Sequence, residues 1–207
     1  MTHLYLVRHG DYIKVKEDGK LVDGQLSPRG VQQAEQLRDR LVKSNAIKPD
    51  ILISSTLQRA RHTAEIIAPA LNLPIVLDEE LEEWRNEDGS LSEEQFFALW
   101  REVTFEQRPY FRWVPGCENW MEFMLRACSA LHRIIHEHED KQIMVICHGG
   151  IIEASFVYFF QMSIANLRQA SVDAQHTSIT HWHTSEIEGF PATWTLQSYN
   201  DTRHLDQ

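Results

Sequence analysis

The sequence predicts an α/β protein with three layers, in which a mostly parallel central sheet carries helices on both faces. Short apolar runs alternate with longer segments whose apolar residues recur every three or four positions, the pattern of strands and covering helices. The 207 residues, 43% hydrophobic and 24% charged, suit a single domain over residues 1–207. The alternation is interrupted once, so we expect a small inserted cap around residues 82–116.

Three of the expected strands run directly into residues that can carry chemistry. These strands, each with the residues that follow it, are His3 to Val7 with Arg8-His9-Gly10, Asp50 to Ser54 with Ser55, and Ile143 to Cys147 with His148-Gly149-Gly150. Three further strands are expected at Pro74 to Leu77, Ser178 to His183 and Thr193 to Tyr199. The segment from Gly19 to Gly24 is expected to be a loop.

The helices are predicted from their starting signals. Ser27 as N-cap and Pro28 at the first helical position indicate one start, with apolar residues at helical spacing behind them. Ser54-Ser55-Thr56 offers capping hydroxyls to a second helix whose apolar face runs to Leu71. Asn119 is predicted to cap a third, long helix.

The segment from Glu79 to Pro115 departs from this rhythm and is interpreted as an excursion rather than a separate domain. It contains many acidic residues, Gly89 and five aromatic residues of interest: Trp84, Phe96, Phe97, Trp100 and Trp113. These side chains could contact a substrate, but we favour the interpretation that they form the small core of the cap itself.

Composition excludes several classes of function. A net charge of −10 argues against non-specific binding of nucleic acid, which depends on a basic face. Three cysteines without a paired framework suit a reduced, cytoplasmic setting. The longest apolar run, Ile151 to Phe160, is interrupted by Glu153 and falls short of the roughly 20 residues that span a membrane, so no membrane partner is expected.

The carboxyl ends of parallel strands meet at one edge of a sheet, where ligands of such folds bind. We therefore expect His9, Arg59 and His148 to converge there. A neutral imidazole is a competent nucleophile, an arginine fork holds phosphate oxygens, and a helix N-terminus near Arg59 favours an anion. A carboxyl group with a raised pKa could protonate a leaving oxygen, for which Glu82 and Glu83 are candidates.

Each of these residues also has an ordinary structural interpretation. Arg8-His9-Gly10 could be a chance tripeptide, His148 a turn histidine, and the glutamates part of a solvated acidic stretch. Arg61 is expected to be a solvated helix arginine, which makes it a control for Arg59. The pairs His181 with His183 and His132 with His136 could bind a metal only with a third ligand, and we expect no metal site or cofactor.

The ordered motifs resemble the histidine phosphatase superfamily, which includes phosphoglycerate mutases and many broad phosphatases. The motifs span nearly the whole chain, and it is their order that makes the resemblance specific. They are Leu4 to Gly10, Leu26-Ser27-Pro28-Arg29-Gly30 with Gln33-Ala34, Ser54 to Ala60 with Thr63-Ala64, Leu81-Glu82-Glu83, Gly116-Cys117-Glu118, Cys147 to Gly150, and Tyr199-Asn200-Asp201 with His204-Leu205.

The resemblance implies a role for each residue. His9 would accept the phosphoryl group on a ring nitrogen, and Glu83 would donate a proton and later activate water. Arg8, Arg59 and His148 would bind the phosphoryl group.

Two departures concern substrate preference. Asp11-Tyr12-Ile13-Lys14 follows Gly10 where the family often has a threonine and an asparagine that reach the phosphate, and Gln25 is our candidate to fill part of that role. His176 stands where the family often has asparagine.

The favoured function is a metal-independent phosphatase acting on a phosphorylated small molecule or a phosphoprotein. A phosphoglycerate-type mutase is a weaker alternative, because such mutases are generally longer. A non-catalytic phosphate-binding or scaffold protein is a second alternative, and a metal-dependent hydrolase is a third. The sequence does not indicate an oligomeric state.

Overall fold

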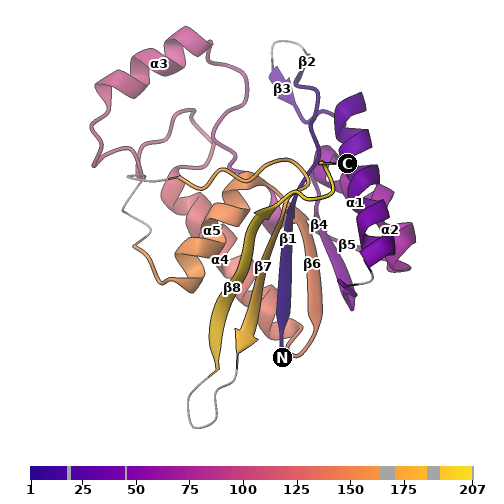
Figure 1. Cartoon of the computed structure of the whole chain (residues 1–207). Coiled ribbons are helices and arrows are strands. Elements are labelled where there is room, and N and C mark those ends of the chain that lie inside the picture. Colours follow the sequence, from indigo (N-terminus) through magenta and orange to yellow (C-terminus); the bar gives the residue numbers. More distant parts are fainter. Residues whose placement is uncertain (18–19, 45, 164–170, 186–191, 207) are drawn as a thin grey trace.

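The computed structural model describes residues 1–17, 20–44, 46–163, 171–185 and 192–206. Its centre is a six-stranded sheet with the strand order β5-β4-β6-β1-β7-β8 (Figure 1). Strands β5, β4, β6 and β1 pair in parallel, and β7 and β8 add an antiparallel edge. The strands are β1 (His3–Arg8), β4 (Ile51–Ser55), β5 (Ile75–Asp78), β6 (Gln142–Cys147), β7 (Ile179–Ser185) and β8 (Thr193–Asp201).

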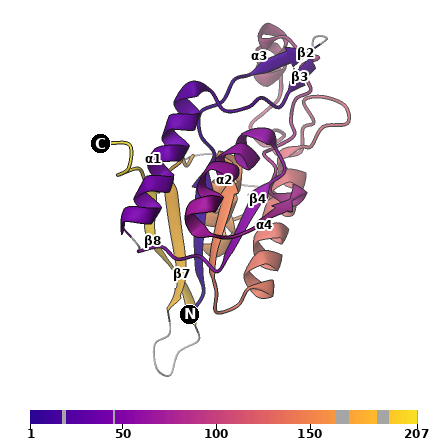
Figure 2. The same cartoon turned by 90° about the vertical axis from the view of Figure 1, so that its right-hand side faces the viewer.

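Helices cover both faces of this sheet, as Figure 2 shows from the side. They are α1 (Pro28–Ser44), α2 (Gln58–Leu71), α3 (Glu93–Glu102), α4 (Trp120–Glu137) and α5 (Gly149–Phe159), with a short 3₁₀ turn, η1, at Glu79–Leu81. Alternate residues of β1 enter opposite cores, because side chains alternate along a strand. Leu4 and Leu6 pack with α4 and α5, whereas Tyr5 and Val7 pack with α1 and α2. The predicted three-layer α/β class is confirmed.

Two of the three expected helix caps are present. Ser27 Oγ accepts a hydrogen bond from the Gly30 amide at 3.1 Å, and α1 begins at Pro28. Asn119 caps α4 by accepting from the Glu122 amide, which completes a reciprocal capping box. The third expectation is wrong: α2 begins at Gln58, and Leu57 at its N-cap has no capping side-chain bond.

The structure also differs from the expected elements before α1 and within the cap. Residues 20–22, expected in a loop, form β3 (Lys20–Val22), which pairs with β2 (Val15–Glu17); residues 18–19 of that expected loop lie outside the described residues. The cap contains α3, with Ser92 as its N-cap. Its amphipathic pattern covers only ten residues, which is why the acidic composition of the segment obscured it. Among the described helices, none has the length and apolar character to cross a membrane.

Candidate active site

The residues predicted at strand ends meet at one edge of the sheet. Arg8 at the end of β1 pairs in register with Cys147 at the end of β6, and Ser54 of β4 pairs with Ile146 of β6. The residues that follow these strands therefore leave the sheet side by side. We call this edge the catalytic rim.

His9 lies at the centre of the catalytic rim and is only 3% exposed. Its Nδ1 lies 2.7 Å from the carbonyl oxygen of Gly10, and Nε2 lies 3.2 Å from Nε of Arg59. A carbonyl can only accept, so Nδ1 carries the proton, and the Arg59 N–H is directed at the lone pair of Nε2. Burial first and the Arg59 guanidinium second lower the pKa of His9 well below its ordinary value. His9 is therefore a neutral imidazole with its Nε2 lone pair directed toward Arg59.

Besides His9, Arg59 contacts one aromatic residue and one acidic residue. Its guanidinium carbon lies 4.7 Å from the ring centre of Tyr12, and Nη1 donates to the carboxylate of Asp23. The other oxygen of Asp23 accepts from the Gln58 amide at the start of α2. Asp23 therefore places a carboxylate at a helix N-terminus, where an anion is stabilised.

His148 lies beside His9, with 5.0 Å between the ring centres, and is fully buried. Its Nε2 lies 2.8 Å from Oγ of Ser55, which comes from the end of β4. Burial and the nearby His9 and Arg59 lower the pKa of His148 well below its ordinary value. Its Nδ1 is buried without a hydrogen-bond partner among the described residues.

Arg8 reaches the catalytic rim from β1. One nitrogen, Nη1, donates to the carbonyl oxygen of Ala174. Its Nε is buried and has no hydrogen-bond partner in the described part of the chain. A Cβ on Gly149 would lie 3.9 Å from both Cζ of Arg8 and Oε2 of Glu83, so the cation and the carboxylate both border the side of this glycine that carries no side chain.

Glu83 is anchored at the catalytic rim by backbone amides. Oε2 accepts from the Gly150 amide at 3.1 Å, and Oε1 accepts from the Trp84 amide at 3.0 Å. A Cβ on Gly150 would lie 2.2 Å from Oε1 of Glu83, so only glycine allows this approach. The second glycine after His148 is therefore explained by the position of Glu83.

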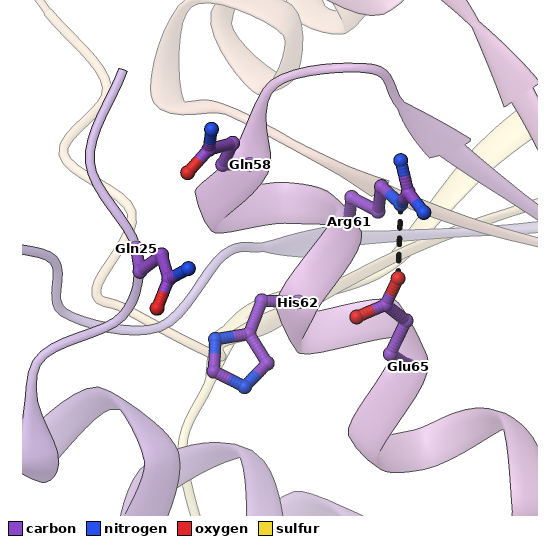
Figure 3. A pocket seen from close by; sticks show the side chains of 5 residues that line it. All are labelled: Gln25, Gln58, Arg61, His62 and Glu65. Carbon is purple, nitrogen blue, oxygen red and sulfur yellow. Dashed lines mark hydrogen bonds and ion pairs between the residues drawn. The ribbon is translucent and has the colours of Figure 1, made fainter. Parts of the chain in front are cut away.

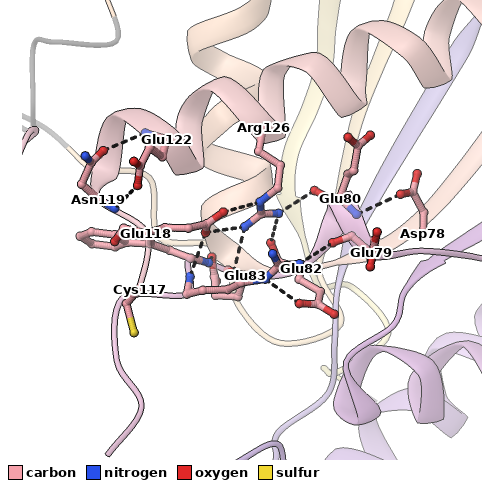
Figure 4. A network of polar contacts seen from close by, with 12 residues as sticks. Asp78, Glu79, Glu80, Glu82, Glu83, Cys117, Glu118, Asn119, Glu122 and Arg126 are labelled. Carbon is pink, nitrogen blue, oxygen red and sulfur yellow. Dashed lines mark hydrogen bonds and ion pairs between the residues drawn. The ribbon is translucent and has the colours of Figure 1, made fainter. Parts of the chain in front are cut away.

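Arg126 of α4 holds the chain segment that carries Glu83 (Figure 4). Its Nη1 donates to the carbonyl oxygens of Glu80 and Glu82 at 2.7 and 2.9 Å, and Nη2 donates to that of Glu83 at 3.3 Å. The carboxylate of Glu118 completes the arrangement by binding Nε and Nη2 at 2.6 and 2.7 Å. We call these contacts the Arg126 clamp.

Glu82 faces other partners than Glu83 does. Oε1 accepts from the Thr56 hydroxyl, and Oε2 accepts from Nε of Arg85 at 2.8 Å. Both oxygens of Glu82 are thus engaged in contacts outside the His9–His148 pair, whereas Glu83 contacts the residues that follow His148. This placement favours Glu83 over Glu82 as the acid.

A pocket of about 260 Å³ opens beside the catalytic rim, and we call it the rim pocket. Arg59, Glu82 and Glu83 line it together with Asp23 and Trp84. One cation of the predicted set and both candidate acids therefore share a cavity that a small ligand can enter.

Gln25 is the one predicted site residue that the structure places elsewhere. It lies in a separate pocket with Gln58, Arg61, His62 and Glu65, on the outer side of α2 (Figure 3). Its neighbour Leu26 is buried, and alternation along the extended backbone turns Gln25 outward. The prediction that Gln25 contacts the phosphate is not supported by this position. Arg61 pairs with Glu65 at 2.9 Å, as expected of a solvated helix residue.

His176 and Thr63 join the catalytic rim although sequence reasoning assigned them no role. The ring of His176 lies 5.4 Å from that of His9, and its Nε2 is buried without a partner among the described residues. Thr63 Oγ1 accepts from the Gly10 amide at 3.0 Å and donates to the carbonyl of Arg59, so it joins the segments that carry His9 and Arg59. The sequence spacing could have indicated this position for Thr63, because a residue four places after Arg59 lies one helical turn further along the same face of α2.

The histidine pairs considered as metal ligands gain no complete ligand set. His3 joins His181, with Nδ1 and Nε2 3.0 Å apart, and the ring of His132 meets that of His136 edge-on. Across the described ranges, no group of three or more histidine, cysteine, aspartate or glutamate side chains is arranged to hold a metal ion.

Comparison with known families gives a match over residues 4–202 to the model of the histidine phosphatase superfamily, branch 1. The chain is 28% identical over 208 residues to an uncharacterized phosphatase, PhoE, of Bacillus subtilis, covering 99% of this chain and 97% of the relative. It is 26% identical to a metal-independent phosphoserine phosphatase of Arabidopsis thaliana, covering 99% and 84%. It is 27% identical to a probable phosphoglycerate mutase, GpmB, of Salmonella paratyphi C, covering 100% and 96%.

The same architecture occurs in a solved structure, YhfR of Bacillus stearothermophilus. The two chains superpose with a TM-score of 0.76 at 24% identity, over 99% of this chain and 100% of the other. This similarity concerns the fold.

Proposed function

The chain belongs to the histidine phosphatase superfamily, and from this premise we propose that it hydrolyses phosphate monoesters through a phosphohistidine on His9. One observation carries the proposal. The His9 ring lies 5.0 Å from that of His148 and 5.4 Å from that of His176, and Arg8 Nε, His148 Nδ1 and His176 Nε2 all lack hydrogen-bond partners in the described residues. Buried unpartnered polar atoms are rare and concentrate where a ligand binds. An anion with several oxygens is the ligand that suits this arrangement.

The first step transfers the phosphoryl group from the ester to the enzyme. Arg59 moves its Nε–H from His9 to a phosphate oxygen, which frees the Nε2 lone pair to attack phosphorus. The P–N bond forms as the P–O bond to the alcohol breaks, and protonated Glu83 gives its proton to the departing oxygen. Arg8, Arg59 and His148 stabilise the charge on the three remaining oxygens.

The second step returns the enzyme to its starting state. The Glu83 carboxylate takes a proton from water while the water oxygen attacks phosphorus. The P–N bond breaks, its electron pair returns to Nε2, and inorganic phosphate leaves. Glu83 is protonated again and His9 is neutral, so the cycle closes without a metal ion or a redox partner.

The substrate class we propose is a phosphorylated small molecule. The rim pocket of about 260 Å³ suits a metabolite-sized ester. The names of two relatives, a phosphoserine phosphatase and a probable phosphoglycerate mutase, point to the same size class.

Replacing the nucleophile tests the proposed mechanism. His9→Ala should lower the kcat for p-nitrophenyl phosphate by about 10⁴-fold or more, because no other group supplies the attacking lone pair. His62→Ala is the matched control, since His62 lies in the pocket outside α2 and should retain activity. Rapid mixing of the wild type with ³²P-labelled substrate should trap an acid-labile, base-stable phosphoenzyme that His9→Ala lacks. Turnover at the wild-type rate in His9→Ala contradicts the mechanism.

Two further assays separate the alternative functions. With 3-phosphoglycerate, a phosphatase releases inorganic phosphate, whereas a mutase forms 2-phosphoglycerate. Dialysis against EDTA should leave the rate unchanged. Loss of activity on chelation and its recovery with zinc would point instead to a metal-dependent hydrolase.

A further inference from the structure

A second cavity, lined mainly by aromatic side chains, lies in the cap beside the rim pocket. We call it the aromatic cap pocket, and it has a volume of about 400 Å³. Its lining includes Trp84, Phe96, Phe97, Trp100, Arg108 and Trp113. This volume falls within the range of pockets that bind small molecules.

The aromatic side chains form a rigid wall rather than a closed core. The ring centres of Trp100 and Trp113 lie 5.0 Å apart with 21° between their planes, and Phe96 lies 5.2 Å from Trp113. The guanidinium of Arg108 stacks over Trp100 at 4.3 Å. Phe97 is 48% exposed, so one side of the pocket remains open. The expectation that these residues form the core of the cap holds for buried Trp113 but not for Phe97.

The aromatic cap pocket adjoins the rim pocket. Trp84 and Asn86 line both cavities. Trp84 directly follows Glu83, and its amide donates to Oε1 of that carboxylate. The oxygen that Glu83 protonates in the proposed mechanism joins the phosphate to the alcohol, so the alcohol leaves from the side of the phosphate that faces Glu83 and its neighbour Trp84.

Two donors in the aromatic cap pocket lack acceptors. Trp113 is 3% exposed, and its Nε1 has no hydrogen-bond partner in the described part of the chain; the same holds for Nε of Arg108. A cap that served only as a packed core would be expected to satisfy or exclude these groups. Both residues also line the open aromatic cavity.

We propose that the aromatic cap pocket binds the alcohol portion of the substrate and selects phosphate monoesters whose alcohol carries an aryl ring. The inference rests on the proposed phosphatase function and adds the substrate class. An aryl ring stacks offset or edge-on against tryptophan and phenylalanine, and it displaces water from an apolar surface. Small polar alcohols such as serine or glycerate leave the pocket unfilled.

The test compares two esters that differ in the group offered to the pocket. These are 2-naphthylmethyl phosphate and ethyl phosphate, which both release a primary alcohol, so the leaving oxygens have similar intrinsic reactivity. The wild type should show a kcat/KM at least about tenfold higher for the naphthylmethyl ester. A ratio near one overturns the inference and leaves the proposed function intact.

Variants locate the preference in the pocket. Phe97→Ala and Trp100→Ala should each reduce the ratio of the two kcat/KM values by about fivefold. Phe97 is half exposed, so its removal does not threaten folding even if Trp100→Ala misfolds. Phe105→Ala is the matched control, because Phe105 is 43% exposed in the same cap and does not belong to the pocket lining. An unchanged ratio in Phe97→Ala overturns the inference.

A binding measurement decides the case even without turnover. Calorimetric titration with 2-naphthylmethylphosphonate, which cannot be hydrolysed, should give a Kd about tenfold lower than ethylphosphonate. Phe97→Ala should remove most of that difference, and Phe105→Ala should keep it. Equal affinity for both phosphonates contradicts the aromatic cap pocket as a substrate site. Absence of hydrolysis of both esters contradicts the proposed function separately.

Discussion

His9 and His148 are buried side by side next to arginine, and this setting determines their protonation. A solvent-exposed imidazole titrates near pH 6.5 and is about three-quarters protonated at pH 6. Burial lowers the pKa of both histidines well below that value. Protonation would remove the lone pair on Nε2 of His9, so the same burial keeps that lone pair available in mild acid.

We expect His9 to remain neutral, with its proton on Nδ1, throughout pH 6 to 8. Long-range ¹H–¹⁵N NMR of the imidazole nitrogens reports both the titration and the tautomer. The single-turnover rate with p-nitrophenyl phosphate should not fall between pH 7 and 6 through protonation of His9. A His9 titration centred near pH 6.5, or a proton on Nε2, would contradict the geometry.

The assignment of Glu83 as the acid predicts a dependence on the leaving group. Glu83→Gln should lower kcat by about 10²-fold or more for an alkyl phosphate, because an alkoxide cannot leave without a proton. The loss should be much smaller for p-nitrophenyl phosphate, whose leaving oxygen is stable as an anion. Glu82→Gln is the control and should show no such dependence, since Glu82 bonds Thr56 and Arg85. The reverse pattern would assign the role to Glu82.

Residues at the strand ends could be located from the sequence, but residues on irregular backbone could not. His9 and His148 follow apolar strands whose ends must meet in a parallel sheet. Whether Gln25 reaches the site depends on which way the side chain of one extended residue faces. Asp23 contacts Arg59 across 36 positions of sequence, from a loop with no periodic pattern. His176 was noticed only as a departure from the family motif, because nothing local indicates that it stands beside His9.

The Arg126 clamp connects α4 to the segment that carries Glu83. The side chains of Arg126 and Glu118 are 13% and 17% exposed, so solvent screens their ion pair only weakly. The clamp satisfies three backbone carbonyls that no helix or strand ladder pairs at those positions. Helix α4 therefore positions Glu83, the acid of the proposed mechanism, from outside the rim pocket.

Arg126→Ala should lower the free energy of unfolding by about 2–3 kcal/mol, because it leaves a partly buried carboxylate and three carbonyls without their donor. Urea denaturation measures this loss. Arg61→Ala, which breaks an exposed pair on α2, should cost less than about 0.5 kcal/mol. If Arg126 acts through Glu83, the kcat for an alkyl phosphate should also fall more than that for p-nitrophenyl phosphate. Equal losses for both substrates would reduce Arg126 to a purely structural role.

Helices with strong end signals were predictable, whereas short elements were not. Ser27-Pro28 and Asn119 mark two starts correctly because their side chains bond the first free amides. The start of α2 was missed because its first amide bonds Asp23, a residue distant in sequence. The β2–β3 hairpin and α3 are each too short for periodicity to distinguish them from loops.

At the scale of the whole molecule, buried histidines make stability depend on pH. Burial lowers the pKa of His181 and of His204 to about 4. The unfolded chain, whose histidines titrate near 6.5, therefore binds more protons than the native protein below that pH. Stability is complete above about pH 6.5 and is lost progressively as pH falls toward the native pKa values.

The midpoint of urea unfolding should accordingly be lower at pH 5 than at pH 7.5. His204→Asn removes one contributing group that bonds Thr177 at 2.9 Å and Arg40 at 3.3 Å. This variant should be less stable than the wild type at pH 7.5 but show a flatter dependence on pH. A midpoint that rises on acidification would contradict the depressed histidine pKa values.

Strand β1, which leads to His9, lies inside the sheet, with β6 on one side and β7 on the other (Figure 1). During synthesis, residues 3–8 emerge before residues 142–147 and cannot pair with them until those have also left the ribosome. At ordinary elongation rates this interval is about ten seconds or more. The nascent chain thus carries an apolar strand with two unpaired edges throughout this interval, and its catalytic rim cannot assemble before β6 has emerged. Chaperones that shield exposed strands have their longest opportunity to act on this part of the protein.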